Sequence, residues 1–270
     1  MSKNDLLREL APVSAGAWEE IETEAKRALK ATLAARKLVD FTGPLGWDAS
    51  AVSLGRADAA GAAPGEGVQA RLRKVQPLVE LRVPFELDRS ELEAVGRGAQ
   101  DTDLDPVRTA ARRLAMAEDR TVFHGFPAAG IRGIGEAAAD SRCTISEDYA
   151  AYLGVVAEAV HRLRSQGVAG PYAIALGPRC FTGLSKTMIG GFPAIEQIRR
   201  LLDGPIVPAP AVDGAVVMSL RGGDFELTVG QDFSIGYLQH TAASVSLYLQ
   251  ESVTFRVLAP EAAVPLVYDA

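Results

Sequence analysis

One stretch of the chain, residues 47–77, has too few large apolar residues to form a core of its own, and this limits what the whole chain can fold into. Its middle, residues 58–67, is small, rich in glycine and almost uncharged. The flanks at 51–56 and 69–74 show the weak alternation of strands. Because a two-stranded arm is marginally stable alone, we expect a long arm with a glycine-rich tip that lies on a neighbouring subunit.

The rest of the chain mixes helices and strands without the regular alternation of a parallel sheet. Apolar faces of helical period predict helices at 14–37, 88–98, 105–124, 146–167 and 193–202. Alternation and short apolar runs predict strands at 77–87, 172–176, 215–220, 225–229, 234–237, 244–249 and 253–258. Ser14 is the expected N-cap of the first helix, and Asp105 with Pro106 is expected to open the third. The predicted fold class is α+β.

Charge and composition argue against two classes of partner. The chain has 28 basic and 34 acidic residues and a net charge of −6, whereas proteins that coat nucleic acid depend on a basic surface. Its apolar runs are shorter than the roughly 18 residues of a membrane-spanning helix. The start of the chain lacks the apolar stretch of a signal peptide, and Cys143 and Cys180 form no paired motif, which suits a reducing compartment. We expect a cytoplasmic protein that binds neither nucleic acid nor membrane.

The sequence contains no recognisable motif for catalysis or metal binding. Its three histidines have no partner at a ligand spacing. The run Asp101-Thr-Asp-Leu-Asp105 begins like a calcium loop, but Pro106 and Arg112 stand where that loop needs glycine and glutamate. Nucleophile elbows, phosphate-binding loops and zinc-protease helices do not occur. We therefore predict no catalytic residue and no metal site.

With these classes set aside, the succession of short motifs resembles that of encapsulin shell proteins. The matching motifs cover nearly the whole chain, and several of them are long. They are Leu10-Ala-Pro-Val, Trp18-Glu-Glu-Ile-Glu, Ala35-Arg-Lys-Leu-Val-Asp-Phe, Pro77-Leu-Val-Glu-Leu-Arg-Val-Pro-Phe-Glu-Leu, Glu118-Asp119, Val122-Phe-His-Gly125, Gly167-Val-Ala-Gly-Pro-Tyr172, Arg221-Gly-Gly-Asp-Phe225, Gly230-Gln-Asp-Phe-Ser-Ile-Gly-Tyr237 and Glu251-Ser-Val-Thr-Phe255.

The resemblance implies the fold of tailed-phage major capsid proteins, with a peripheral domain, an axial domain and an extended loop. The predicted helix at 105–124 corresponds to the spine of the peripheral domain. The expected domains are residues 1–46 with 77–140 and 228–270 (peripheral), 47–76 (extended loop) and 141–227 (axial). A short chain without insertions favours the smallest icosahedral shell, a closed assembly of roughly sixty copies.

The resemblance also implies a partner. Encapsulins enclose a cargo enzyme, commonly a ferritin-like protein or a dye-decolourising peroxidase, through a short C-terminal peptide of the cargo. In this sequence the expected cargo-peptide site comprises Leu33, Arg36, Asp40, Asp232, Ile235 and Tyr237. Apolar side chains would form the pocket, while Arg36 and the acids would fix the register of the peptide. Ordinary core packing would explain the three apolar residues equally well, and both aspartates are common turn residues.

Two further features of the family map onto this sequence. The loop that surrounds the fivefold pore corresponds to Met188, Ile189, Gly190, Gly191 and Phe192, where paired glycines allow close approach of backbones; a plain tight turn is the alternative. Some encapsulins stack a flavin on an aromatic residue in the segment that matches residues 87–92. Ser90 stands in that place here, so we predict no cofactor.

Two other functions stay open beside the leading one. A phage or prophage capsid protein would share the fold, although a net negative charge argues against packing DNA. A soluble hydrolase with an unfamiliar site would be a monomer or a dimer. The leading expectation is a non-enzymatic shell subunit that self-assembles, captures cargo and lets small solutes pass.

Overall fold

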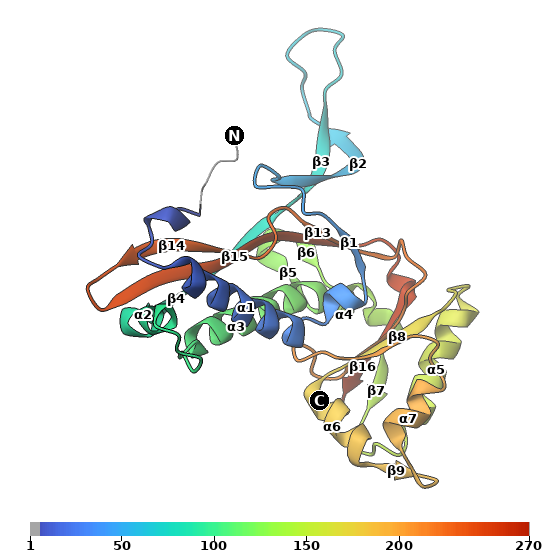
Figure 1. Cartoon of the computed structure of the whole chain (residues 1–270). Coiled ribbons are helices and arrows are strands. Elements are labelled where there is room, and N and C mark those ends of the chain that lie inside the picture. Colours follow the sequence, from blue (N-terminus) through green and yellow to red (C-terminus); the bar gives the residue numbers. More distant parts are fainter. Residues whose placement is uncertain (1–5, 270) are drawn as a thin grey trace.

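The computed structural model describes residues 6–269 and shows two bodies and a projecting arm (Figure 1). The larger body carries two long helices, α1 (Ala15–Thr32) and α3 (Asp105–Phe123). The smaller body has a sheet of its own and three helices, α5 (Tyr152–Ser165), α6 (Pro178–Lys186) and α7 (Ala194–Arg199). Helices and strands are mixed in both bodies, as the predicted α+β class requires.

The sheet of the larger body is organised around one long strand. Its members are β1 (Asp40–Thr42), β4 (Val79–Asp88), β13 (Phe225–Val229), β14 (Ser234–His240) and β15 (Ser244–Val257). β15 pairs along one edge with β4 and along its other edge with β14 and then β13, always antiparallel. β1 lies beyond β13 and runs parallel to it. The two strands predicted at 244–249 and 253–258 form the single continuous strand β15.

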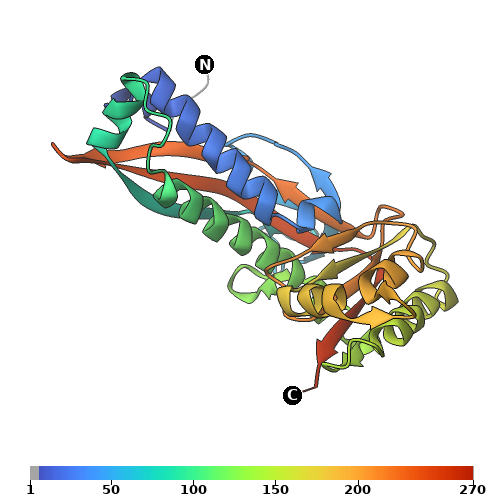
Figure 2. The same cartoon turned by 60° about the horizontal axis from the view of Figure 1, so that its bottom comes forward.

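Helices α1 and α3 lie side by side along this sheet (Figure 2). α1 begins where predicted, because the Ser14 hydroxyl accepts a hydrogen bond of 3.2 Å from the Ala17 N–H. It ends at Thr32, earlier than predicted, because the Asp119 carboxylate of α3 accepts the N–H groups of Ala34 and Ala35, each at 2.9 Å. The short 3-10 helix η2 (Ala35–Lys37) follows this break.

Several other helices begin or end away from their predicted positions. Asp105 is the first residue of α3 instead of its cap, with Pro106 in the first turn. Helix α2 (Arg89–Gly96) is capped by Asp88, whose side chain accepts the Ser90 N–H at 2.7 Å. Helix α5 begins at Tyr152, because the residues before it form turns held by the side chains of Ser146 and Asp148.

The smaller body contains a five-stranded sheet with a buried centre. Its order is β11 (Ile206–Pro208), β8 (Tyr172–Leu176), β12 (Ala215–Ser219), β16 (Ala263–Tyr268) and β7 (Cys143–Ile145). Every residue of β8 and β12 is buried. The expected grouping of residues 228–270 with the larger body is wrong for β16, which pairs with β12 and β7. After β15 ends, the turn η5 (Pro260–Ala262) carries the chain into this second sheet.

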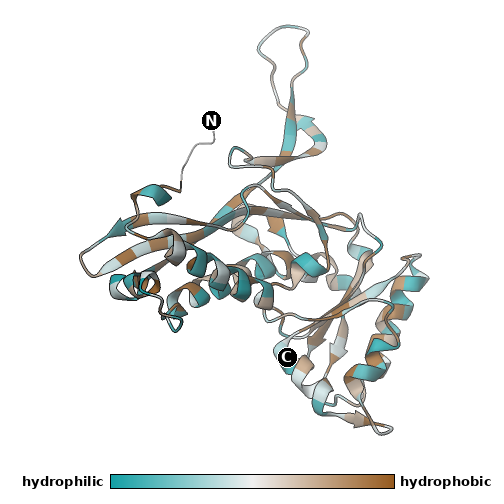
Figure 3. Cartoon of the chain, viewed as in Figure 1, coloured by the Kyte–Doolittle hydropathy of each residue, from teal (hydrophilic) through white to brown (hydrophobic). Residues whose placement is uncertain are grey.

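The arm is a two-stranded antiparallel ribbon of β2 (Ala51–Ala59) and β3 (Arg71–Pro77) that projects from the larger body (Figure 1). Figure 3 shows apolar and polar residues interspersed along it. Val68, Leu72 and Val75 are exposed. The remaining short elements are η1 (Arg8–Leu10), β5 (Gly125–Phe126), η3 (Pro127–Ala129), β6 (Ile131–Arg132), α4 (Ile134–Ala137), η4 (Ala139–Ser141), β9 (Met188–Ile189) and β10 (Phe192–Pro193).

Candidate functional site

A groove of about 220 Å³ opens between the start of the described chain, helix α1 and strand β14. Four elements supply its walls. The lining residues are Leu6 and Arg8, then Glu22, Ala25, Lys26 and Leu29 of α1, Phe233, Ser234 and Ile235 around the start of β14, and Leu249 of β15. The groove therefore lies between helix α1, near the N-terminus, and strands β14 and β15, near the C-terminus.

The floor of the groove is apolar because the inner face of α1 and one face of the β14–β15 pair both contribute apolar side chains to it. Ala25 and Leu29 are one turn apart on α1 and share its inner face. Ile235 of β14 lies directly opposite Leu249 of β15 in the antiparallel register. All four side chains are buried and belong to the same apolar cluster. An apolar peptide side chain placed here would contact this cluster directly.

The rim of the groove is polar and includes an edge of the sheet. Arg8 forms a 2.5 Å ion pair with Glu22 and lies 4.1 Å above the ring of Trp18. Lys26 is exposed and has no ion pair within residues 6–269. On the outer edge of β14, the Tyr237 N–H donates to the Leu6 carbonyl at 2.8 Å. This contact shows that the edge of β14 can pair with a neighbouring backbone. An apolar floor, a charged rim and a nearby strand edge are the features of a site for an extended peptide.

At one end of the groove, Phe233 packs on the guanidinium of Arg36. The Phe233 ring centre lies 4.4 Å from this guanidinium. Arg36 donates through Nε and Nη2 to the Glu118 carboxylate, at distances down to 2.6 Å, through Nη1 to Asp232 at 2.8 Å and through Nη2 to Glu251 at 3.2 Å. These contacts tie η2 to α3, to β15 and to the loop before β14.

The charges around Arg36 are strongly coupled. Glu118 and Glu251 are fully buried. Burial and the neighbouring Glu118 carboxylate raise the pKa of Glu251 well above its usual range, which favours the neutral form of its carboxyl group. Burial opposes the positive charge of Arg36, but its carboxylate partners raise the pKa of Arg36 above the ordinary value. Arg36 is therefore permanently charged, and Glu118 is its principal counter-ion.

The structure brings together most of the residues expected in a cargo-peptide site. Leu33 and Ile235 are buried in one apolar cluster, and Tyr237 packs against that cluster. Arg36 and Asp232 form the ion pair described above. Ile235 is the member of the expected set that lines the groove itself.

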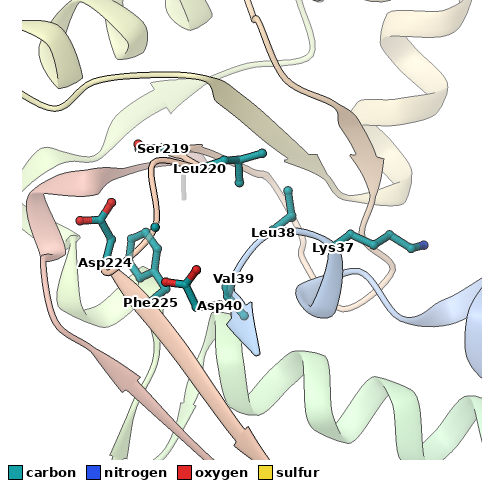
Figure 4. Close-up of a pocket in the computed structure, with 9 residues that line it drawn as sticks. Lys37, Leu38, Val39, Asp40, Ser219, Leu220, Asp224 and Phe225 are labelled. Atoms are coloured by element: carbon teal, nitrogen blue, oxygen red, sulfur yellow. The ribbon is translucent and has the colours of Figure 1, made fainter. Parts of the chain in front are cut away.

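Asp40 lies apart from the other expected residues. Its carboxylate accepts the Gly223 N–H at 2.6 Å and faces a separate pocket of about 190 Å³ between the two bodies. Figure 4 shows Asp40 near Asp224 and Phe225, with Lys37 on the opposite side of this pocket. In the structure Asp40 joins β1 to the turn before β13.

Several residues of the groove were absent from the expected set. Phe233 occupies the end of the groove, Leu29 lies on its floor and Lys26 on its rim. The sequence contains a signal for two of these three residues. Leu29 belongs to the apolar face of the first predicted helix, and Phe233 lies within the motif that ends at Tyr237. Lys26 has no such signal, since exposed lysines are common on helices.

The expected pore loop forms a tight hairpin at the far end of the smaller body (Figure 1). Strands β9 and β10 pair Ile189 with Phe192. Gly190 and Gly191 both have positive φ, 57° and 86°, which a two-residue hairpin of this type requires. Met188 and Phe192 are 59 % and 53 % exposed. The hairpin thus presents two large apolar side chains beside a glycine tip.

Residues 6–269 contain no group of three or more histidine, cysteine or acidic side chains that could hold a metal ion. Within the same residues, no helix combines the length and apolar character needed to cross a bilayer. The contacts that the groove offers are apolar packing and charge beside a strand edge.

The chain matches known proteins over almost its whole length. Residues 3–254 match the model of a family described as encapsulating protein for peroxidase. A type 1 encapsulin shell protein of Rhodospirillum rubrum is 60 % identical over 97 % of this chain and 96 % of that protein.

Solved structures confirm the predicted capsid-like fold. The virus-like particle of Pyrococcus furiosus superimposes with a TM-score of 0.64 at 18 % identity, over 91 % of this chain and 97 % of the other. The capsid of an empty GTA particle superimposes with a TM-score of 0.51 at 15 % identity, over 87 % and 89 %.

Proposed function

This chain belongs to the family of encapsulin shell proteins, and from that premise we propose that it builds a closed icosahedral shell around a cargo protein. The capsid-like fold supports the shell, and the groove between α1 and β14 supports the capture of cargo. The role is structural, and we propose no catalytic activity for the chain. We place the shell in the cytoplasm.

We propose that the groove binds a C-terminal peptide of the cargo. Apolar side chains of the peptide would contact Leu29, Ile235 and Leu249, and its backbone would run along the outer edge of β14, beside the contact of Tyr237 with Leu6. Arg36 is fully engaged with carboxylates of its own chain, so its proposed role is to hold Phe233 and the end of the groove in place. Lys26 is the rim charge available to the peptide.

We propose that the arm lies across a neighbouring subunit, in a shell of roughly sixty copies. The exposure of Leu72 and Val75 in the single chain supports this arrangement, because assembly would bury them. The matching family is described as encapsulating a peroxidase, which favours a dye-decolourising peroxidase as cargo; a ferritin-like protein is the second candidate. The content is protein and not nucleic acid.

The observation that carries this function is the apolar groove, and its test is cargo retention. A fluorescent protein carrying the C-terminal peptide of the co-purifying cargo is produced together with the shell. Ile235→Asp places a carboxylate on the groove floor, which costs several kcal/mol unless the carboxylate is paired. We expect intact shells that no longer retain the reporter.

The matched control is Leu238→Asp, which puts the same charge on an exposed position of the same strand and should leave loading unchanged. Where Ile235→Asp prevents assembly, Ser234→Trp fills the groove from a half-buried position and gives the same test. Normal loading into intact shells of either groove variant would contradict the proposed site.

A further inference from the structure

Another cavity, of about 440 Å³, lies where the arm joins the larger body, and three arginines line it. Arg56 comes from β2 of the arm, Arg132 from β6 and Arg256 from the end of β15. These residues are far apart in the sequence, and only the fold brings them together. No acidic residue is among the described residues that line the cavity.

The carboxylates around the cavity do not balance its positive charge. Arg256 forms a 2.5 Å ion pair with Glu226 of β13. Arg132 lies 3.5 Å from Glu136 of α4 in an exposed pair, which contributes little attraction in water. Arg56 has no ion pair within residues 6–269. An excess of positive charge therefore surrounds the open volume.

One donor of Arg256 is buried and unpaired. Its Nε has no hydrogen-bond partner among the described residues, although the side chain is only 20 % exposed. Its Nη1 reaches the Ser53 carbonyl only at 3.5 Å, the outer limit of a hydrogen bond. A buried donor without an acceptor costs about 1–3 kcal/mol. Because Nε is closed to solvent, a group in the cavity would contact this guanidinium through Nη1, which makes only the long contact with Ser53.

We propose that this cavity binds a phosphate oxyanion. Phosphate carries about two negative charges and several strong acceptor oxygens, and the planar fork of arginine matches it in both charge and geometry. A volume of 440 Å³ also admits the organic part of a phosphate ester. The bound group would link the base of the arm to the body and reduce the repulsion among the three arginines. This site shares no lining residue with the cargo groove.

Isothermal titration of assembled shells with inorganic phosphate, at constant ionic strength, tests the proposal. We expect one saturable site per chain in the parent shell. Arg56→Gln and Arg132→Gln each remove one charged donor from exposed positions, and each should weaken binding about tenfold or more. Arg73→Gln removes the same charge from the neighbouring strand of the arm, outside the cavity, and should leave binding unchanged.

A second readout is the melting temperature of the shell, which phosphate should raise in the parent and in Arg73→Gln but not in Arg56→Gln. Titration with glycerol 3-phosphate distinguishes a site for free phosphate from a site for an organic phosphate ester. Equal affinity would assign the site to phosphate itself, and tighter binding would assign the remaining volume to the organic part of an ester. The absence of saturable heat at constant ionic strength, or equal weakening in Arg73→Gln, would overturn the proposal.

Discussion

At the scale of single residues, Arg36 connects the groove to the interior of the larger body. It is held between Phe233 and Phe41, 4.4 and 5.0 Å from their ring centres, and it pairs with two fully buried carboxyl groups. Removing one partner of a buried ion pair costs about 3–5 kcal/mol, because the remaining charge stays buried. The two carboxyl groups do not contribute equally.

We predict that Glu118→Gln destabilises the chain by about 3–5 kcal/mol, whereas Glu251→Gln costs less than about 1 kcal/mol. The raised pKa of Glu251 favours its neutral carboxyl form, and glutamine matches that form in shape and charge. Glu118 carries the bidentate contact with Arg36. Thermal melting of both variants at neutral pH checks the difference, and equal losses would contradict this division of roles.

A second residue-scale prediction concerns Asp119 and pH. Burial, only partly offset by the N–H groups of Ala35 and Ala34, raises the pKa of Asp119 from 3.8 to about 6. A carboxyl group with a raised pKa in the folded state stabilises that state fully below about pH 3.8, and this contribution is lost as the pH rises through 6. The side-chain amide of the variant Asp119→Asn does not titrate, so that variant lacks this pH-dependent contribution.

The stability of Asp119→Asn should therefore fall further behind that of the parent protein by about 1.4 kcal/mol between pH 7 and pH 5. Melting curves of both proteins at the two pH values measure this widening gap. A gap that stays constant or narrows over this range would show that Asp119 does not titrate as its burial requires.

At the scale of elements, local patterns in the sequence predict regular segments well and miss breaks caused by distant residues. Strands β8 and β13 occur at the predicted residues 172–176 and 225–229. The early end of α1 depends on Asp119, which lies more than eighty residues away, and no local pattern contains it. The polar residues Gln250 and Glu251 suggest a break in β15, but both are buried and have partners from Gln231 and Arg36.

In the groove, too, some residues could be predicted from the sequence and others depend on contacts between distant segments. Ile235, which the resemblance to encapsulins predicted, lines the groove, whereas the contact of Arg36 with Glu118 and Glu251 depends on tertiary packing of α3 and β15. Asp40 lies near the predicted set in sequence, but its strand β1 carries it to the turn before β13. Proximity along the chain was therefore an incomplete guide to the site.

The arm offers a prediction at this scale. Deleting residues 57–68 removes its tip and part of its strand pairing, and we expect a sharp loss of assembly or of thermal resistance. The double variant Leu72→Ser, Val75→Ser sharpens the test, because both side chains are exposed in the single chain. Burying an apolar side chain of this size contributes about 1.5–3 kcal/mol, so the shell should lose stability while the subunit fold does not.

The control for this experiment is Arg73→Ser on the same strand, which removes no large apolar side chain and should leave assembly close to that of the parent shell. Native gel electrophoresis and melting curves of purified particles provide the readout. Unchanged particles with unchanged melting in both the deletion and the double variant would refute the role of the arm in subunit contacts.

The hairpin of β9 and β10 gives a prediction about solute entry. If five copies of its glycine tip converge around a pore, deleting residues 189–191 should widen the opening and speed the quenching of an enclosed fluorophore by a small solute. Electron microscopy must show closed particles for the comparison to count. An unchanged quenching rate in such particles would mean that solutes enter elsewhere and that the hairpin is only a tight turn.

At the scale of the whole molecule, the shape of the chain favours assembly. Two bodies joined side by side and a projecting ribbon (Figure 1) leave apolar residues of the arm exposed, such as Val68 and Leu72. A monomer would leave these side chains in water, whereas we expect a shell to bury them between subunits. The net charge of −6 suits an interior that holds a protein instead of nucleic acid.

The mass of the purified particle tests the central claim most directly. A closed shell of roughly sixty chains of 28.5 kDa has a mass of about 1.7 MDa, and charge-detection mass spectrometry measures it without assumptions about shape. We predict a narrow population near that mass, increased by whatever cargo is enclosed and free of nucleic-acid absorbance. A protein that remains a monomer or a dimer at cellular concentrations would contradict the assignment as a shell subunit.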